Sequence, residues 1–199
     1  MFSFKKCGEK SCHNFIFNGG LFCLKHCARE SHTEEKALEF IRDTQLIQNL
    51  NFQFMKFQDF SFSGKHINSC FFKNCSFRNC DFSDVQINQS FFDFSDFENC
   101  TFRKSTMKFV SLAASDFYHC TINESDIFHS NFNGSKISSC DFSGNDFYFS
   151  AFLNGNLKQT DFSNCNIKKV SFVFSKLDGI NFKFSNTQEV LFEMSGYQI

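Results

Sequence analysis

A period of five residues runs through most of this chain and limits the folds that it can adopt. Every fifth position from residue 52 to residue 197 is apolar in 29 of 30 cases, and Phe is the most frequent residue there. Two residues before each of these positions, the side chain is Cys, Ser, Thr, Val or Gly in 24 of 30 cases. A repeat that holds one register over this length predicts a structural unit of five residues.

This period fits neither regular secondary structure. On an α-helix a step of five residues advances about 140° around the axis, so the apolar side chains would scatter over all sides. On a straight strand an odd spacing would place successive Phe residues on opposite faces. All of the Phe side chains can be buried together only if the chain turns a corner once per unit. We therefore expect an all-β solenoid.

The sequence also indicates how many units complete one coil, because positions twenty residues apart resemble one another. Ile67, Ile87 and Ile127 belong to one such column, and Phe72, Phe92 and others form a column that is almost entirely Phe. Four units per coil predict a square cross-section with about 7.5 coils stacked at the strand spacing of about 4.8 Å. The chain contains no Pro, as expected if the backbone N–H groups of each coil bond to a neighbouring coil.

The repeat units include SCFFKN, NCSFRN, NCDFSD, SCDFSG and NCNIKK. With these units the chain resembles the pentapeptide-repeat family, whose consensus is a small residue, Asp or Asn, then Leu or Phe, followed by two polar residues. The resemblance implies a right-handed quadrilateral parallel β-helix, which we place at residues 51–199.

Residues 1–30 lie outside the repeat and contain a candidate metal site. The spacing C-x4-C-x10-C-x2-H supplies three thiolates and an imidazole, a donor set that suits tetrahedral zinc. This segment resembles small treble-clef zinc fingers, and a patch of its size needs a metal to fold. The predicted ligands of a structural zinc ion are Cys7, Cys12, Cys23 and His26. Cys27 is a rival fourth ligand, His13 is a weaker candidate, and free cysteines with incidental spacing are the alternative.

Residues 31–50 are predicted to form a helix that covers the N-terminal end of the solenoid. Ser31 and Glu34 have the spacing of a capping box, and apolar residues from Ala37 to Leu50 cover one broad side. No comparable segment follows Tyr197, so the last coil would present an open edge. We expect a homodimer through this C-terminal end, and the resemblance implies the same, since gyrase-protecting members of the family are dimers of this kind.

Several Phe residues in the repeat region fall at outward positions, where the core cannot use them. Folded onto a four-sided coil, five of them share one side, which we call the aromatic outer wall: Phe54, Phe71, Phe91, Phe94 and Phe174. Outward apolar patches of this extent are typical of partner-binding surfaces. The alternative is that the corner geometry turns some of these rings inward.

The sequence favours a non-catalytic scaffold that binds a protein partner through the aromatic outer wall. It contains no motif of a common enzyme class. Its formal net charge of -1 gives no reason to expect nucleic acid or a membrane surface as partner. Eleven cysteines favour a reducing compartment, so we expect a cytoplasmic protein. The alternative, drawn from the family resemblance, is a DNA mimic that protects or inhibits DNA gyrase or topoisomerase, which requires an acidic surface.

Overall fold

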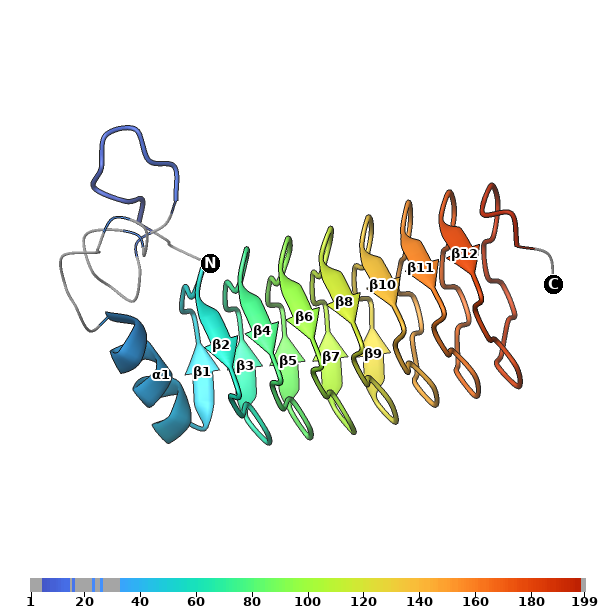
Figure 1. Ribbon diagram of the computed structural model, residues 1–199, viewed down its shortest axis with the longest axis horizontal. Helices are drawn as coiled ribbons and strands as arrows, with labels where there is room; N and C mark the ends of the chain where they lie inside the picture. The colour runs from blue at the N-terminus through green and yellow to red at the C-terminus, as the bar shows by residue number, and fades with distance from the viewer. Residues whose placement is uncertain (1–4, 15, 17–22, 24–25, 27–32, 198–199) are drawn as a thin grey trace.

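The molecule is a straight stack of rectangular coils with one short helix at its N-terminal end (Figure 1). The computed structural model describes residues 5–14, 16, 23, 26 and 33–197. Within this part the chain makes about seven turns of a parallel β-solenoid. The fold predicted from the five-residue period, a four-sided β-helix, is confirmed.

The regular elements are short. The helix α1 spans Thr33–Asp43 and precedes all of the strands. Within residues 33–197 there are twelve strands of three residues each: β1 (Leu46–Gln48), β2 (Lys56–Gln58), β3 (His66–Asn68), β4 (Ser76–Arg78), β5 (Gln86–Asn88), β6 (Asp96–Glu98), β7 (Thr106–Lys108), β8 (Asp116–Tyr118), β9 (Asp126–Phe128), β10 (Lys136–Ser138), β11 (Asn156–Lys158) and β12 (Lys176–Asp178).

These strands form two parallel sheets, each one wall of the coil. One sheet has the order β1-β3-β5-β7-β9, and the other has the order β12-β11-β10-β8-β6-β4-β2. The register joins residues twenty apart, as in the pairs Ile67↔Ile87 and Phe77↔Phe97. Rows of isolated bridges with the same register, such as Phe71↔Phe91 and Asp81↔Thr101, form the two remaining walls. Four units of five residues therefore complete one coil.

The corners of the coil have a special backbone conformation. Every fifth residue from Asn49 to Met194 has a positive φ, between 46° and 72°. This is the left-handed region, which Gly, Asn and Asp adopt most easily because a larger side chain crowds the following carbonyl. One such residue per unit turns the chain through a corner, so the inward position recurs every five residues.

Stacked aromatic rings fill the interior. Ring centroids of Phe77 and Phe97 lie 4.7 Å apart, and those of Phe82 and Phe102 lie 4.4 Å apart, with the planes nearly parallel. The side chains of Phe82, Phe102 and Phe142 are completely buried or nearly so. Such pairs are stabilised beyond the burial of apolar area by about 0.5–1.5 kcal/mol each.

The small inward residues join successive coils by hydrogen bonds. Ser95 Oγ donates to the carbonyl of Phe72 at 2.8 Å and accepts from the backbone N–H of Cys75 at 3.0 Å. At other inward positions a thiol donates to the carbonyl of the preceding coil, as Cys75 Sγ does to the carbonyl of Phe52 at 3.0 Å. Ser and Cys recur at this position because they are small and can donate to a buried carbonyl.

The helix covers the first coil as predicted, but it is shorter than the sequence suggested. Ala37 and Ile41 of α1 are buried in the same core as the first Phe rings. The helix ends at Asp43 rather than at residue 50, because Ile47 already occupies the inward position of β1 and pairs with Ile67. Of the predicted capping box, Ser31 lies outside the described residues.

An unexpected lysine fixes the end of this helix. Lys65 occupies an inward position that is usually small, and it is 8% exposed. Its Nζ donates to the carbonyls of Arg42 and Thr44, each at 3.0 Å. The ammonium group thereby satisfies carbonyls at the C-terminal end of α1, where a positive charge is also favoured by the helix dipole.

The substitution Lys65→Met should detach the helix from the coil. It leaves two carbonyls without their donor, and hydrogen bonds to a charged group contribute about 1.5–3 kcal/mol. We expect the free energy of unfolding in urea to fall by about 2 kcal/mol and amide exchange in α1 to accelerate. Lys56→Met, at an exposed position of β2, is the control. Equal effects of the two substitutions would contradict the role given to Lys65.

Candidate functional site: a cysteine and histidine cluster and an aromatic wall

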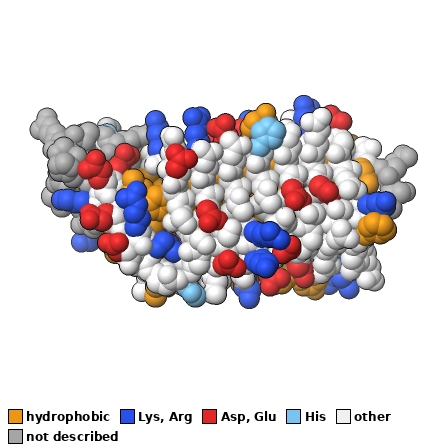
Figure 2. Space-filling model, turned by 60° about the horizontal axis from the view of Figure 1, so that its bottom comes forward, with side chains coloured by type: hydrophobic (Ala, Val, Ile, Leu, Met, Phe, Trp, Pro, Cys, Tyr) orange, Lys and Arg blue, Asp and Glu red, His pale blue; other side chains and the backbone are white. Residues whose placement is uncertain are grey.

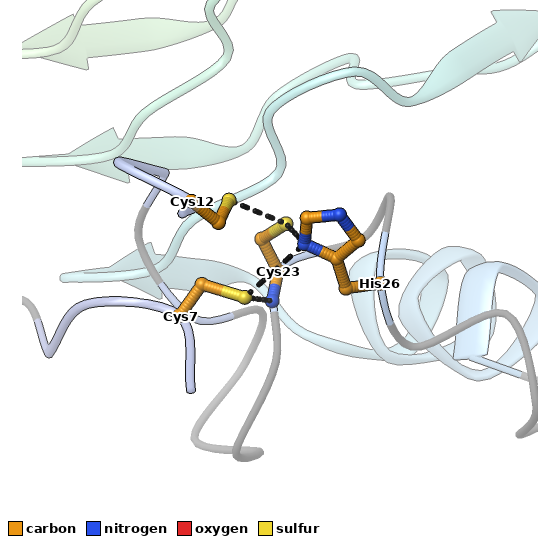
Figure 3. Close-up of side chains that lie close together, drawn as sticks. All are labelled: Cys7, Cys12, Cys23 and His26. Atoms are coloured by element: carbon orange, nitrogen blue, oxygen red, sulfur yellow. Dashed lines mark hydrogen bonds between the residues drawn. The ribbon is translucent and has the colours of Figure 1, made fainter. Parts of the chain in front are cut away.

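The predicted metal ligands lie together near the N-terminus. The side chains of Cys7, Cys12, Cys23 and His26 point toward one another (Figure 3), and their ligand atoms all lie within 4.8 Å of one another. Cys12 Sγ and Cys23 Sγ are 3.7 Å apart, which is too long for a disulfide. His26 Nδ1 lies 3.4 Å from Cys7 Sγ and 3.5 Å from Cys23 Sγ. These four residues could hold a metal ion.

Backbone hydrogen bonds order the loop that carries these ligands. The N–H of Cys7 donates to the carbonyl of Asn14 at 2.8 Å, which closes the segment around Cys12. The N–H of Cys23 donates to Cys7 Sγ at 3.3 Å. Burial alone would raise the pKa of the Cys7 thiol, but hydrogen bonds from the backbone of Cys23 and Glu9 and from the side chains of His26 and Cys23 together lower this pKa to about 6. A thiolate is therefore favoured at this position, as metal binding requires.

The rival ligands have different outcomes. His13 is exposed and does not belong to the cluster. Cys27 lies outside the described residues.

The N-terminal segment that carries the cluster is connected to the first coil through Asn51, whose Nδ2 donates to the carbonyl of Ile16 at 3.0 Å.

Three buried cysteines of the repeat, Cys70, Cys75 and Cys165, are not suited to act as nucleophiles. Burial raises the pKa of the Cys70 thiol to about 11 and those of Cys75 and Cys165 to about 12. A thiol with such a pKa stays protonated near neutral pH and is a poor nucleophile. These side chains act instead as small donors to buried carbonyls.

The structure divides the residues of the aromatic outer wall into two groups. Phe94 and Phe174 are exposed at 60% and 56%. Phe54, Phe71 and Phe91 are half-buried. The rings of Phe71 and Phe91 stack with their centroids 4.8 Å apart.

A lysine lies over the half-buried pair of rings. Lys73 Nζ is 5.9 Å from the ring centroid of Phe71 and 5.4 Å from that of Phe91. The same ammonium group pairs with Asp93 at 3.0 Å. The N-terminal end of the aromatic outer wall is therefore partly covered by its own polar side chains.

The Phe residues at the corners share a backbone feature that could not be predicted from the sequence. Six corner residues with positive φ are Phe, as many as are Asn: Phe54, Phe94, Phe109, Phe149, Phe174 and Phe184. A bulky residue in this conformation costs about 1–2 kcal/mol relative to Gly or Asn. Their register, two residues after each inward position, was visible in the sequence, but the left-handed backbone there was not.

Beside Phe94 and Phe174 lies a surface without charged side chains, which we call the uncharged face. It consists of the outward residues on four consecutive coils: Ser111, Ala113, Asn131, Asn133, Ala151, Leu153, Ser171 and Val173. Elsewhere the molecule looks different: Figure 2 shows a side on which acidic and basic side chains are interspersed. Half of these residues are apolar and half are Ser or Asn. Together with the exposed rings at its corners, the uncharged face is the surface best suited to contact another molecule.

A second set of exposed rings borders the same face. Phe109, His129 and Phe149 stack along one corner, with centroid distances of 5.1 Å and 5.2 Å. Lys169 Nζ lies 4.9 Å from the ring centroid of Phe149. Phe109, His129 and Phe149 are not among the five residues predicted from the sequence for the aromatic outer wall.

Residues 33–197 contain no helix that is long and apolar enough to cross a membrane.

The family model for pentapeptide repeats matches residues 80–118 and 146–183, in eight copies. A comparison with curated proteins found no match.

Among solved structures, a trypsin-treated form of QnrB1, a plasmid-mediated fluoroquinolone resistance protein, is 17% identical. That match covers 71% of this chain and 79% of that chain, with a TM-score of 0.30. HetL of the cyanobacterium Nostoc sp. strain PCC 7120, a pentapeptide repeat protein involved in heterocyst differentiation regulation, is 10% identical. That match covers 83% of this chain and 98% of the HetL chain, with a TM-score of 0.26.

Rfr23, a pentapeptide repeat protein of the cyanobacterium Cyanothece 51142, is also 10% identical, with coverage of 79% and 97% and a TM-score of 0.38. The segments that the family model matches make up less than half of the chain, and both lie within the β-helix. The family model identifies residues 80–118 and 146–183 as pentapeptide repeats, and this match supports the pentapeptide-repeat family for the chain.

Proposed function

We propose that the protein is a non-catalytic scaffold that binds a protein partner through the uncharged face and the exposed rings of the aromatic outer wall. The observation that carries this proposal is the exposure of Phe94 and Phe174 at corners with positive φ. At such a corner Phe is unfavourable for the backbone, and its ring is exposed to water. Neither folding nor solubility explains its presence, whereas contact with a partner does.

The charge distribution supports an apolar contact. Outward residues of the uncharged face bear no charge over four coils, so an apolar surface can be laid on it without burying an unpaired ion. Aromatic side chains at its edges supply large contact areas at a low cost in conformational entropy.

For the N-terminal cluster we propose a structural zinc ion. With Zn–S bonds near 2.3 Å and a Zn–N bond near 2.0 Å, a tetrahedral site separates two sulfurs by about 3.8 Å and a sulfur from a nitrogen by about 3.5 Å. The distance between Cys12 and Cys23 and those from His26 to Cys7 and Cys23 agree with these values. When bound, the ion would fix the N-terminal segment against the first coil.

The alternative function, mimicry of DNA toward gyrase or topoisomerase, has less support from the surface. Mimicry requires rows of unpaired acidic groups spaced like duplex phosphates. Here several acidic side chains form ion pairs with basic side chains of the same chain, with nitrogen–oxygen distances of 2.9–3.3 Å: Arg78 with Glu98, Arg103 with Glu124, Lys136 with Asp116, and Lys168 with Glu189. Acidic and basic groups also alternate on the side seen in Figure 2.

Replacing an exposed corner Phe should stabilise the fold. We expect Phe94→Asn to raise the free energy of unfolding in urea by about 1 kcal/mol, because Asn tolerates the left-handed backbone. The reverse change in the same row, Asn154→Phe, should lower it by a similar amount. A loss of stability in Phe94→Asn would show that this ring serves the fold.

The same rings should be needed for partner binding. We expect the double variant Phe94→Asp/Phe174→Asp to capture its partner from an extract of the source cells at least tenfold less than the unchanged chain does, because hot-spot aromatics dominate such interfaces. Phe184→Asp is a matched control, since Phe184 is also an exposed Phe with positive φ but lies on another corner. Equal capture by the double variant and this control would reject the proposed surface.

The zinc proposal predicts one zinc ion per full-length chain, measured by elemental mass spectrometry. Cys12→Ser and His26→Ala should each lower the zinc content and the affinity measured against a chromogenic chelator, since each removes a ligand. His13→Ala should leave both unchanged. If Cys27→Ser removes zinc and His26→Ala does not, Cys27 is the fourth ligand. Retention of zinc in Cys12→Ser would contradict the assigned site.

A further inference from the structure

The two corner rows that border the uncharged face are complementary in size. The first row, read along five consecutive coils, is Gln89, Phe109, His129, Phe149 and Lys169. The second row, at the opposite edge of the same coils, is Phe94, Ala114, Gly134, Asn154 and Phe174. Of the two corners at which a coil borders the uncharged face, one is therefore aromatic, counting His129, and the other is not. The small corners Ala114 and Gly134 lie across the face from Phe109 and His129.

The raised parts of these edges are held in place by contacts within the chain. Phe109, His129 and Phe149 stack with interplanar angles of 15° and 12°, and Lys169 caps the last ring. Phe109 and Phe149 are nevertheless 58% and 46% exposed. The three rings thus form a preordered ridge, which would lose little conformational entropy on binding.

We propose that the uncharged face binds a second copy of this chain, in a parallel side-by-side pair whose twofold axis runs along the rod. The proposal rests on the proposed function of this face and names its partner. Such an axis brings each first-row residue opposite the second-row residue of the same coil in the other copy. The ring of Phe109 then meets Ala114 of the second copy, and His129 meets Gly134 of the second copy. Two rings of the ridge thus face the smallest corners, and this happens twice by symmetry. Phe149 faces Asn154 of the second copy, and Phe94 faces Gln89 of the second copy.

The charges and the size of the face agree with this occupant. Because the uncharged face has no ions, apposing two identical faces creates no like-charge contact. At the end of the face, Lys169 would meet the ring of Phe174 of the second copy, where a cation–π contact is favourable. The coil of Phe94 also carries Asp93, but this side chain is buried and pairs with Lys73 of the same chain at 3.0 Å. Five coils at the strand spacing of about 4.8 Å give a contact about 24 Å long. A contact this small belongs to the weak class of interfaces, so the pairing should depend on concentration.

The test is sedimentation equilibrium of the full chain from micromolar to near-millimolar concentration. We expect the mass to rise toward twice that of the monomer. Ala114→Asp and Phe109→Lys should each hold the mass at the monomer value, because each buries one unpaired charge from either copy, two in the pair. The double variant Ala114→Asp/Phe109→Lys should restore the pairing, because each Asp then faces a Lys of the second copy. Asp and Lys already occupy left-handed corners at Asp84 and Lys104, so these variants should fold.

Other results would overturn the proposal. A wild-type chain that stays monomeric over the whole range excludes the pair. A mass increase that Ala114→Asp does not change places the association elsewhere, as would stacking through the C-terminal end. The pair would be antiparallel if Ala114→Asp/Asn154→Lys restores self-association and Ala114→Asp/Phe109→Lys does not. In an antiparallel pair, residue 114 faces residue 154.

These results are separable from the test of the proposed function. If the wild-type chain is monomeric but Phe94→Asp/Phe174→Asp loses a captured protein, the docking face stands and its partner is a different molecule. If neither self-association nor capture depends on these residues, the face has no docking role.

Discussion

The stacking of each coil on the next, at twenty residues along the chain, is the interaction on which the rest of the structure depends. Many of the large inward residues donate their N–H to a carbonyl nineteen residues later, as from Phe72 to Phe91 and from Phe92 to Ser111, both at 2.7 Å. The same stacking places aromatic rings on the rings of the preceding coil. It also lets the inward Ser and Cys side chains donate hydrogen bonds to carbonyls of the preceding coil. Backbone bonding, aromatic stacking and side-chain bridging thus share one repeat distance, and a residue that breaks one of them disturbs all three.

This arrangement separates the residues that fold the chain from those that are free to serve a function. Inward positions are filled by the large apolar and small polar side chains that the coil requires. Corner positions need only a residue that accepts positive φ, for which Asn, Asp and Gly are the least costly. Five of the six Phe residues at corners are exposed and lie outside the core, which makes the corners the part of the surface most in need of another explanation: Phe94, Phe109, Phe149, Phe174 and Phe184. A rod of this kind can therefore change its binding surface without changing its fold.

The sequence predicted the coil well because its period is a direct consequence of the geometry. An inward ring every five residues excludes helix and straight strand, and similarity at twenty residues gives four sides. The position of Lys65 could not be predicted, because its role depends on how α1 packs against the first coil, which is tertiary information. The cluster of Cys7, Cys12, Cys23 and His26 was predictable because metal ligands come from short local loops. The choice between His26 and Cys27 was not, because both spacings allow the same approach.

The most direct test of this account is the detection of scalar couplings across backbone hydrogen bonds by NMR. The account predicts couplings from the amide nitrogens of Phe72, Phe82 and Phe92 to the carbonyl carbons of Phe91, Thr101 and Ser111, each nineteen residues later. Couplings from these amides to carbonyls four residues earlier would instead indicate helix. Either that pattern or a set of partners without a common spacing would contradict the stacked coil.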